Sequence, residues 1–250
     1  LAIGVDKRPK GTTPRKASSY SRAIFDEFSH DGLLDEQRPD ALTVYRQLLA
    51  GAPDHSVTIA SIGFLTNLDS LLHSPGDAID VRDGIALVQA KVRLLSLMGG
   101  KYPSGKEYNL SFGDSADAAR YVIEHWPDTE VPMVFGGFEL GGAVISGKAF
   151  VDAPPSPMRR CYELAYDSLR KGRPSWDQLT ILHAVRGCSH ANVTYWTEIA
   201  GSNAIAADGT NTWQLMPARR QTYLVSALGN AAMTTLLDGL MIHPPSALGR

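Results

Sequence analysis

This sequence of 250 residues contains few cysteines and has a net charge close to zero. Its two cysteines, Cys161 and Cys188, are too few for a disulfide scaffold and too far apart for a cysteine-based zinc site. Lysine and arginine number 24 against 26 aspartates and glutamates, so the net charge of −2 lacks the basic excess of a nucleic-acid binder. The composition therefore excludes a disulfide-stapled mini-protein and predicts that the protein has no nucleic-acid partner.

Long apolar runs and the common catalytic motifs are also missing. No stretch approaches the roughly 18 consecutive apolar residues that a membrane span needs, so the sequence predicts no membrane partner. There is no P-loop, no Gly-x-Ser-x-Gly, no Gly-x-Gly-x-x-Gly and no His-x-x-x-His, and the seven histidines are scattered. The chain opens on Leu1 with no methionine and no charged-then-apolar leader, so we expect that a targeting signal was removed or left out.

The sequence does contain a regular alternation of strand and helix patterns. Apolar and β-branched runs that end on glycine or a loop predict strands at 1–5, 56–62, 91–98 and 131–135. Apolar residues at helical spacing predict helices at 41–50, 65–72, 114–126 and 159–170. Asp40 is expected to cap the first of these helices, and Asp114 or Ser115 the third.

This alternation predicts the fold class. Strands that alternate with helices indicate a wound α/β fold, with a mostly parallel central sheet and helices on both faces. Because the sequence shows no internal repeat and no convincing linker, residues 1–250 are expected to form one domain. Ligands of such sheets bind where the strands end, so the loops after the predicted strands are the places where a site is expected.

Three of these loops carry polar residues whose role the sequence leaves open. Residues 63–67 fit a strand-to-helix turn. Glu107 and Asn109 lie two positions apart, so in an extended segment both side chains would face the same side, as a clamp on sugar hydroxyls requires; solvated loop residues are the alternative. Asp177 precedes a helical apolar pattern, and it is either a helix cap or first-turn carboxylate, or a metal ligand.

The order of these loops is more informative than each loop alone. The matching elements are Val57 to Asn67 with its Gly-x-Leu-Thr-Asn end, Met98-Gly99-Gly100 followed by Glu107-Tyr108-Asn109, and Ser175-Trp176-Asp177. In this order they resemble the inosine–uridine-type nucleoside hydrolase family, in particular its fungal-type secreted branch. The similarity covers most of the chain, down to the closing Met241-Ile242-His243-Pro244-Pro245.

The resemblance implies a function and a site. Members of the family hydrolyse the N-glycosidic bond of ribonucleosides, and a bound Ca²⁺ holds the ribose hydroxyls and the nucleophilic water. By position, Ile62 would supply a main-chain carbonyl to the metal and Asp177 a carboxylate, while Asn109 would contact the ribose hydroxyls and Glu107 the region near the 5′ end. Asp177 and Asn109 are thus the expected catalytic residues. Trp176 is expected to stack on the base.

Two features depart from the family pattern. The aspartate-rich first strand and loop, which supply the other metal ligands and the general base, have no counterpart, because this chain begins downstream of them. Asp77, Asp80 and Asp83 are spaced three apart, which suits a turn or one helical face instead. Trp176 stands where many members keep a histidine that activates the leaving group, and an indole cannot donate a proton as an imidazolium does.

These departures leave alternatives open. One is a non-catalytic relative that binds a nucleoside or a sugar, and another is a structural protein that retains only the fold. Loss of an opening strand, usually central in such a sheet, would expose neighbouring edges, so we expect either an associated upstream peptide, an absent segment, or another cover for the sheet. A small-molecule nucleoside is the expected ligand, secretion the favoured location, and a homo-oligomer is compatible with the sequence.

Overall fold

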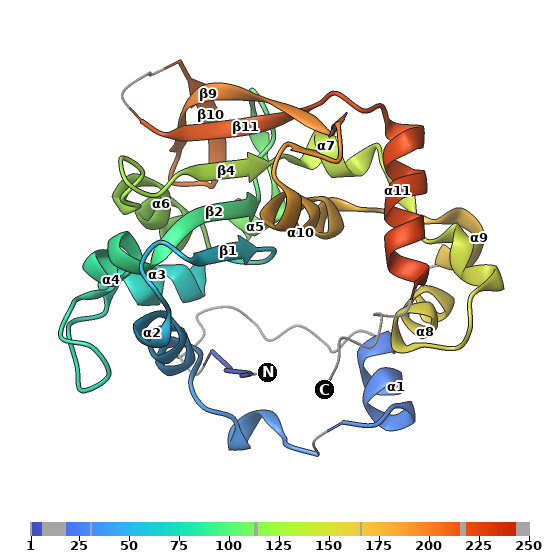
Figure 1. Ribbon diagram of the computed structural model, residues 1–250, viewed down its shortest axis with the longest axis horizontal. Coiled ribbons are helices and arrows are strands. Elements are labelled where there is room, and N and C mark those ends of the chain that lie inside the picture. Colours follow the sequence, from blue (N-terminus) through green and yellow to red (C-terminus); the bar gives the residue numbers. More distant parts are fainter. Residues whose placement is uncertain are drawn as a thin grey trace.

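A computed structural model describes residues 2–6, 19–30, 32–112, 115–165, 167–215 and 219–243. It contains a seven-stranded sheet with the strand order β1-β2-β4-β11-β9-β10-β3 (Figure 1). Its strands are β1 (Val57–Ser61), β2 (Val92–Met98), β3 (Ser104–Lys106), β4 (Met133–Gly136), β9 (Trp196–Ile205), β10 (Thr210–Gln214) and β11 (Gln221–Ser226). Two short ladders pair β5 (Ile145–Ser146) with β6 (Arg173–Pro174) and β7 (Ser189–His190) with β8 (Val193–Thr194).

Helices surround this sheet. They are α1 (Ser19–Glu27), α2 (Ala41–Gly51), α3 (Thr66–His73), α4 (Gly84–Lys91), α5 (Tyr108–Ser111), α6 (Ser115–His125), α7 (Phe138–Gly142), α8 (Pro157–Leu164), α9 (Ser168–Lys171), α10 (Trp176–Arg186) and α11 (Asn230–Ile242), with short 3₁₀ turns η1 (Asp35–Gln37) and η2 (Lys148–Asp152). Within the described part of the chain, no helix has both the length and the apolar character of a membrane span.

The sheet has a parallel part and an antiparallel part. Strands β1, β2, β4 and β11 are mutually parallel, whereas β9, β10 and β3 continue the sheet with antiparallel pairing. The predicted α/β fold class is therefore confirmed. The antiparallel strands of the last third were not predicted. No strand among the described residues pairs with the outer edge of β1.

Both faces of the parallel strands are buried under helices. Leu95 and Leu97 of β2 belong to a core with residues of α3, α4 and α6, whereas Leu94 packs on a second core formed with α10 and α11. β4 repeats the pattern, because Phe135 joins the first core and Val134 the second. This alternation follows from the two-residue period of a strand and places α10 on the face opposite α3 and α6.

Two predicted elements are wrong. Among the residues described from 1–5, only an isolated bridge between Val5 and Asp40 forms, so no strand is present there. The predicted helix at 159–170 is broken into α8 and α9, because Ala165 leaves the helical region and Asp167 has a left-handed backbone with φ of 59°. Asp40 caps α2 as predicted, through a hydrogen bond of 3.1 Å from the Leu42 amide, whereas Asp114 lies outside the described residues.

The three evenly spaced aspartates have structural roles. Asp77 accepts two hydrogen bonds from the guanidinium of Arg46, at 2.7 and 3.1 Å. Asp80 pairs with Arg82 at 2.7 Å, and Asp83 caps α4 by accepting from the Ala86 amide at 2.8 Å. Only 1% of Arg46 is exposed, so this buried arginine fastens the loop between α3 and α4.

Candidate active site

The parallel strands β1, β2 and β4 bring their carboxyl ends to one edge of the sheet, and α5 is fastened to the end of β2 there. The Gly100 amide donates to Glu107 Oε2 at 3.2 Å, and Asn109 Nδ2 donates to the Met98 carbonyl at 3.1 Å. Phe138, which opens α7, donates its amide to the Gly100 carbonyl at 2.8 Å. The loops after β2 and β4 therefore form one connected platform.

Glu107 is a buried carboxylate, with 5% of the residue exposed. It does not lie in an extended segment beside Asn109, as the clamp interpretation assumed; it caps α5 by accepting from the Asn109 amide at 2.9 Å. Burial raises the pKa of Glu107, backbone amides of Asn109, Gly100 and Leu110 oppose that shift, and the charge of Asp177 adds to it. The fold thus brings Asp177 near enough for its charge to reach Glu107, 70 positions earlier in the chain, although Glu107 does not line the cavities beside Asp177.

Asp177 occupies the first turn of α10, directly inside the helix N-terminus. The N-cap is Ser175, so the helix-cap interpretation of Asp177 is wrong and the first-turn position is confirmed. No hydrogen bond or ion pair from another described residue reaches the Asp177 carboxyl. The residue is open to solvent, yet enough protein atoms lie near its carboxyl for desolvation to raise the pKa of Asp177. The positive charge of Arg173 has the opposite, smaller effect and lowers this pKa. A carboxylate of this kind is available to a ligand.

Trp176 is held by the short helix α7. Its indole N–H donates to the Phe138 carbonyl at 2.8 Å, and the two rings stack with centroids 5.2 Å apart. Gly141 allows the close approach, because a Cβ there would lie only 2.4 Å from the Trp176 ring. With its N–H used in this way, Trp176 offers a ligand only the face or edge of its ring.

This contact gives a prediction for two adjacent glycines. Gly141→Ala should destabilise the protein by about 1–3 kcal/mol, because the added methyl group overpacks against Trp176. Gly142→Ala is the matched control, since a Cβ at Gly142 meets its nearest neighbour, Trp176 Nε1, at an ordinary 3.7 Å. Chemical unfolding followed by tryptophan fluorescence measures both effects. Equal stability of the two variants would show that Trp176 is not fixed by this contact.

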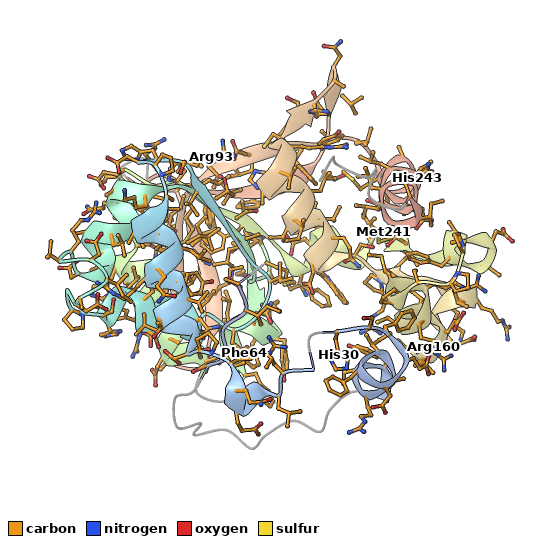
Figure 2. The ribbon with its side chains drawn as sticks, turned by 60° about the horizontal axis from the view of Figure 1, so that its bottom comes forward. His30, Phe64, Arg93, Arg160, Met241 and His243 are labelled. Carbon is orange, nitrogen blue, oxygen red and sulfur yellow. The ribbon has the colours of Figure 1, made fainter. Side chains whose placement is uncertain are left out.

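A cavity of about 950 Å³ opens beside Asp177. Helices α8, α10 and α11 form most of its wall, and Ile62, which follows β1, completes it. The wall is largely apolar, including Met158, Ile181 and Met241, and Asp177, Gln178, Arg186 and His243 are among its polar residues. Figure 2 shows Met241 and His243 at the α11 side of the molecule and Phe64 at the sheet side. The volume suits a small organic ligand with an apolar part.

Three aromatic residues that the sequence analysis did not single out as site residues gather next to Glu107 and Asn109. The rings of Tyr108, which opens α5, and Phe112, the residue after α5, stack with centroids 4.6 Å apart, and the ring centroid of Phe64, which follows β1, lies 5.5 Å from that of Tyr108. All three are partly or largely open to solvent. The four-residue spacing of Tyr108 and Phe112 was a signal that these two rings could meet across one helical turn, but the proximity of Phe64 depends on the fold.

The predicted metal ligands are only partly assembled. Ile62 and Asp177 line the same cavity, so the two residues lie in one region. Calcium needs six to eight oxygen ligands. Of the side chains that the structure describes, Asp177 belongs to no set of three histidine, cysteine or carboxylate groups at ligand distance. These residues alone therefore do not make a calcium site, and no chemical step is assigned to that ion.

Comparison with solved structures places this arrangement in a known fold. A plant nucleoside hydrolase, PpNRh1, superposes with a TM-score of 0.61 at 14% identity, covering 94% of this chain and 77% of that one. The chain has a nucleoside hydrolase-like fold. A purine-preferring ribonucleoside hydrolase from Gardnerella vaginalis gives a TM-score of 0.61 at 14% identity, covering 92% and 77% of the two chains.

A third similar structure is not named as an enzyme. The type III effector protein XopQ, complexed with adenosine diphosphate ribose, gives a TM-score of 0.52 at 15% identity and covers 91% of this chain and 73% of that one. No protein-family model and no curated protein matches the sequence. At these identities the similarity concerns the fold, and function has to be argued from the residues of the site.

Proposed function

We propose that this protein is a nucleoside hydrolase that cleaves the N-glycosidic bond of ribonucleosides to give ribose and the free base. The observation that carries the proposal is the Asp177 carboxyl, which forms no hydrogen bond or ion pair with another described side chain and lines a largely apolar cavity. Glycosidic cleavage passes through an oxocarbenium-like transition state, and a carboxylate stabilises that positive charge. The fold shared with two nucleoside hydrolases supports this assignment.

The other residues have distinct roles in this proposal. Asn109 gives its Nδ2 to Met98, so its Oδ1 is the atom that would accept a hydrogen bond from a ribose hydroxyl. Glu107 shares its two oxygens with backbone amides and would act near the 5′ end while holding α5 in place. The apolar wall of the cavity would cover the base, and the ring of Trp176, which lines a smaller neighbouring cavity together with Asp177 and Gln178, would stack on the base from that side. We place the protein in the fungal-type secreted branch, on the sequence elements alone.

The direct test measures release of free base and reducing ribose from inosine and uridine by the purified protein. Hydrolysis that follows the enzyme concentration and is lost in an Asp177 variant would support the proposal. Tight binding of a nucleoside without any base release would favour the second candidate, a non-catalytic binding protein. That candidate rests on Trp176, whose indole replaces a proton-donating group, and on the similarity to an effector complexed with adenosine diphosphate ribose.

The charge near Asp177 leads to a prediction on pH dependence. Because the pKa of Asp177 is raised, its carboxylate is lost at a higher pH than that of an ordinary aspartate as the solution is acidified. Arg173→Gln removes a positive charge that lowers this pKa, so the acid limb of kcat/KM should move to still higher pH. The control is Arg170→Gln, an exposed arginine that pairs with Asp167. An acid limb that is identical in both variants would show that Asp177 does not control it.

The residues of this chain are expected to bind Ca²⁺ poorly. The family resemblance implies Ca²⁺, but Asp177 and the Ile62 carbonyl supply two of the six to eight oxygens that the ion needs. Leu1–Arg250 should therefore bind Ca²⁺ weakly or not at all in a calorimetric titration. A submicromolar dissociation constant would contradict this, and would mean that carboxylates such as Glu107 close the site.

The partners of the chain remain proposals as well. An upstream peptide that stays associated would supply the missing carboxylates, and intact mass together with N-terminal sequencing of the purified material tests for it. The same material in a sedimentation experiment tests self-association. The expected substrate in every case is a small nucleoside and not a nucleic acid.

A further inference from the structure

A second group of chemically reactive side chains lies at the other end of α10. A ring nitrogen of His183, the Sγ of Cys188 and a carboxylate oxygen of Glu198 lie within 4.8 Å of one another. His183 belongs to the last turn of α10, Cys188 follows the helix, and Glu198 is near the start of β9. No residue of the proposed active site takes part in this cluster.

The backbone around Cys188 is firmly placed. Gly187 ends α10 with a φ of 68°, and its amide donates to the His183 carbonyl at 2.8 Å. The Cys188 carbonyl accepts from the amides of Tyr195 at 2.8 Å and Trp196 at 3.3 Å. These bonds close the β7–β8 hairpin and hold the end of α10 against the start of β9. The cluster is thus positioned by main-chain geometry and not by flexible side chains alone.

Ser96 is the hydrogen-bond partner of the His183 ring. Its Oγ lies 2.9 Å from His183 Nδ1 and 3.2 Å from the Thr180 carbonyl, to which it can donate its single proton. In the tautomer whose Nδ1 donates to Ser96, Nε2 keeps a free electron pair for a metal. Metal-binding histidines are oriented in this way by a partner on the other ring nitrogen. On Glu198, Thr222 plays a similar part by donating to Oε1 at 3.0 Å.

We propose that His183, Cys188 and Glu198 form a zinc-binding site. A nitrogen, a sulfur and an oxygen ligand suit Zn²⁺, whereas Ca²⁺ prefers oxygen alone. Zinc bonds of about 2.0–2.3 Å place tetrahedral ligand atoms roughly 3.5 Å apart, so a small movement of the exposed Glu198 side chain completes the set. Three protein ligands leave a fourth position for water. On binding, the Cys188 thiol gives its proton to solvent as the zinc–thiolate bond forms.

Without a metal, the Cys188 thiol keeps its proton. Burial, together with the charge of Glu198 and a hydrogen bond to it, raises the pKa of Cys188 to about 11, so the thiol is protonated at neutral pH. Zinc replaces that proton and neutralises the Glu198 charge. The ion would join the end of α10 to β9, and so fix the helix whose other end carries Asp177. This role is structural and does not depend on the proposed hydrolase activity.

Cobalt is the spectroscopic probe for the test. The complete 250-residue protein, freed of metal, is titrated with Co²⁺, which occupies such sites and gives a thiolate-to-metal charge-transfer band. We expect one Co²⁺ per chain, displacement by Zn²⁺, and no displacement by Ca²⁺. Zinc at about 100 times its dissociation constant should also raise the thermal midpoint by roughly 5–10 °C.

Three variants make the test specific. Cys188→Ser should lose the charge-transfer band, while Cys161→Ser, which changes the other free cysteine, should keep it. Glu198→Gln, at an exposed position that folding tolerates, should weaken Co²⁺ binding at least 10-fold. Absence of the band in the wild-type protein, an unchanged band in Cys188→Ser, or unchanged affinity in Glu198→Gln would each overturn the proposal. If Cys188→Ser fails to fold, the Glu198→Gln comparison decides.

Discussion

Asp177→Ala is expected to lower the hydrolysis of inosine and uridine by several orders of magnitude while the protein remains folded. The substitution removes the negative charge that would stabilise the oxocarbenium-like transition state, and electrostatic stabilisation of this kind is often the largest single contribution to catalysis. The carboxyl forms no hydrogen bond with the rest of the described chain, and Ser175, not Asp177, occupies the N-cap position of α10. Base release and a melting curve on the same sample measure the two effects.

Asp83→Ala is the matched control for this experiment. Asp83 caps α4 through a hydrogen bond of 2.8 Å from the Ala86 amide, and loss of such a cap costs about 0.5–2 kcal/mol. It lies in the loop fastened by Arg46, away from the cavity. Asp177→Ala should therefore lose turnover and keep its stability, whereas Asp83→Ala should lose stability and keep its turnover. Near-normal turnover in Asp177→Ala would remove Asp177 from the catalytic residues.

Arg46→Met is expected to cause the largest loss of stability, about 3 kcal/mol. The guanidinium of Arg46 donates to the Asp77 carboxylate, the Ser74 hydroxyl and the carbonyls of Asp80 and Arg82. A hydrogen bond from a charged group contributes about 1.5–3 kcal/mol to stability, but these contributions do not add, because all the bonds come from one group. Methionine fills much of the buried volume but leaves these acceptors without their donor. Urea unfolding gives the difference in the free energy of unfolding.

A surface arginine provides the comparison. Arg22 pairs with Asp26 one turn further along α1, and its side chain is 76% exposed. Arg22→Met should leave the unfolding midpoint nearly unchanged, since exposed pairs of this kind contribute little. If both variants unfolded at the same urea concentration, the loop between α3 and α4 would not depend on Arg46. Hydrolysis should change little in either variant, because neither arginine touches the cavity.

Local sequence patterns determined three of the four parallel strands, β1, β2 and β4. The strands at 57–61, 92–98 and 133–136 and the helix at 41–51 lie within a few residues of their predicted bounds, because apolar periodicity reports burial directly. The same patterns did not reveal β9, β10 and β11. β9 and β10 pair antiparallel, and β11 pairs antiparallel with β9 and parallel with β4, so the positions of these strands depend on partners that are distant in the chain. The helix predicted at 159–170 is two helices in the structure, because Ala165 has an extended backbone and Asp167 a left-handed one.

For the candidate site, too, the sequence determined some features and the tertiary structure determined the others. The sequence by itself determined that Ile62 and the segment with Glu107 and Asn109 follow the parallel strands β1 and β2, whereas Asp177 was singled out by the resemblance to a family motif. Only the tertiary structure decided what each group does there, because hydrogen bonds and desolvation depend on neighbours that are distant in the chain. It turned Glu107 inward as a cap, fixed Trp176 on Phe138, and left Asp177 facing a cavity. It also brought Cys188 to His183 and Glu198, a contact that spacing between the two cysteines could not indicate.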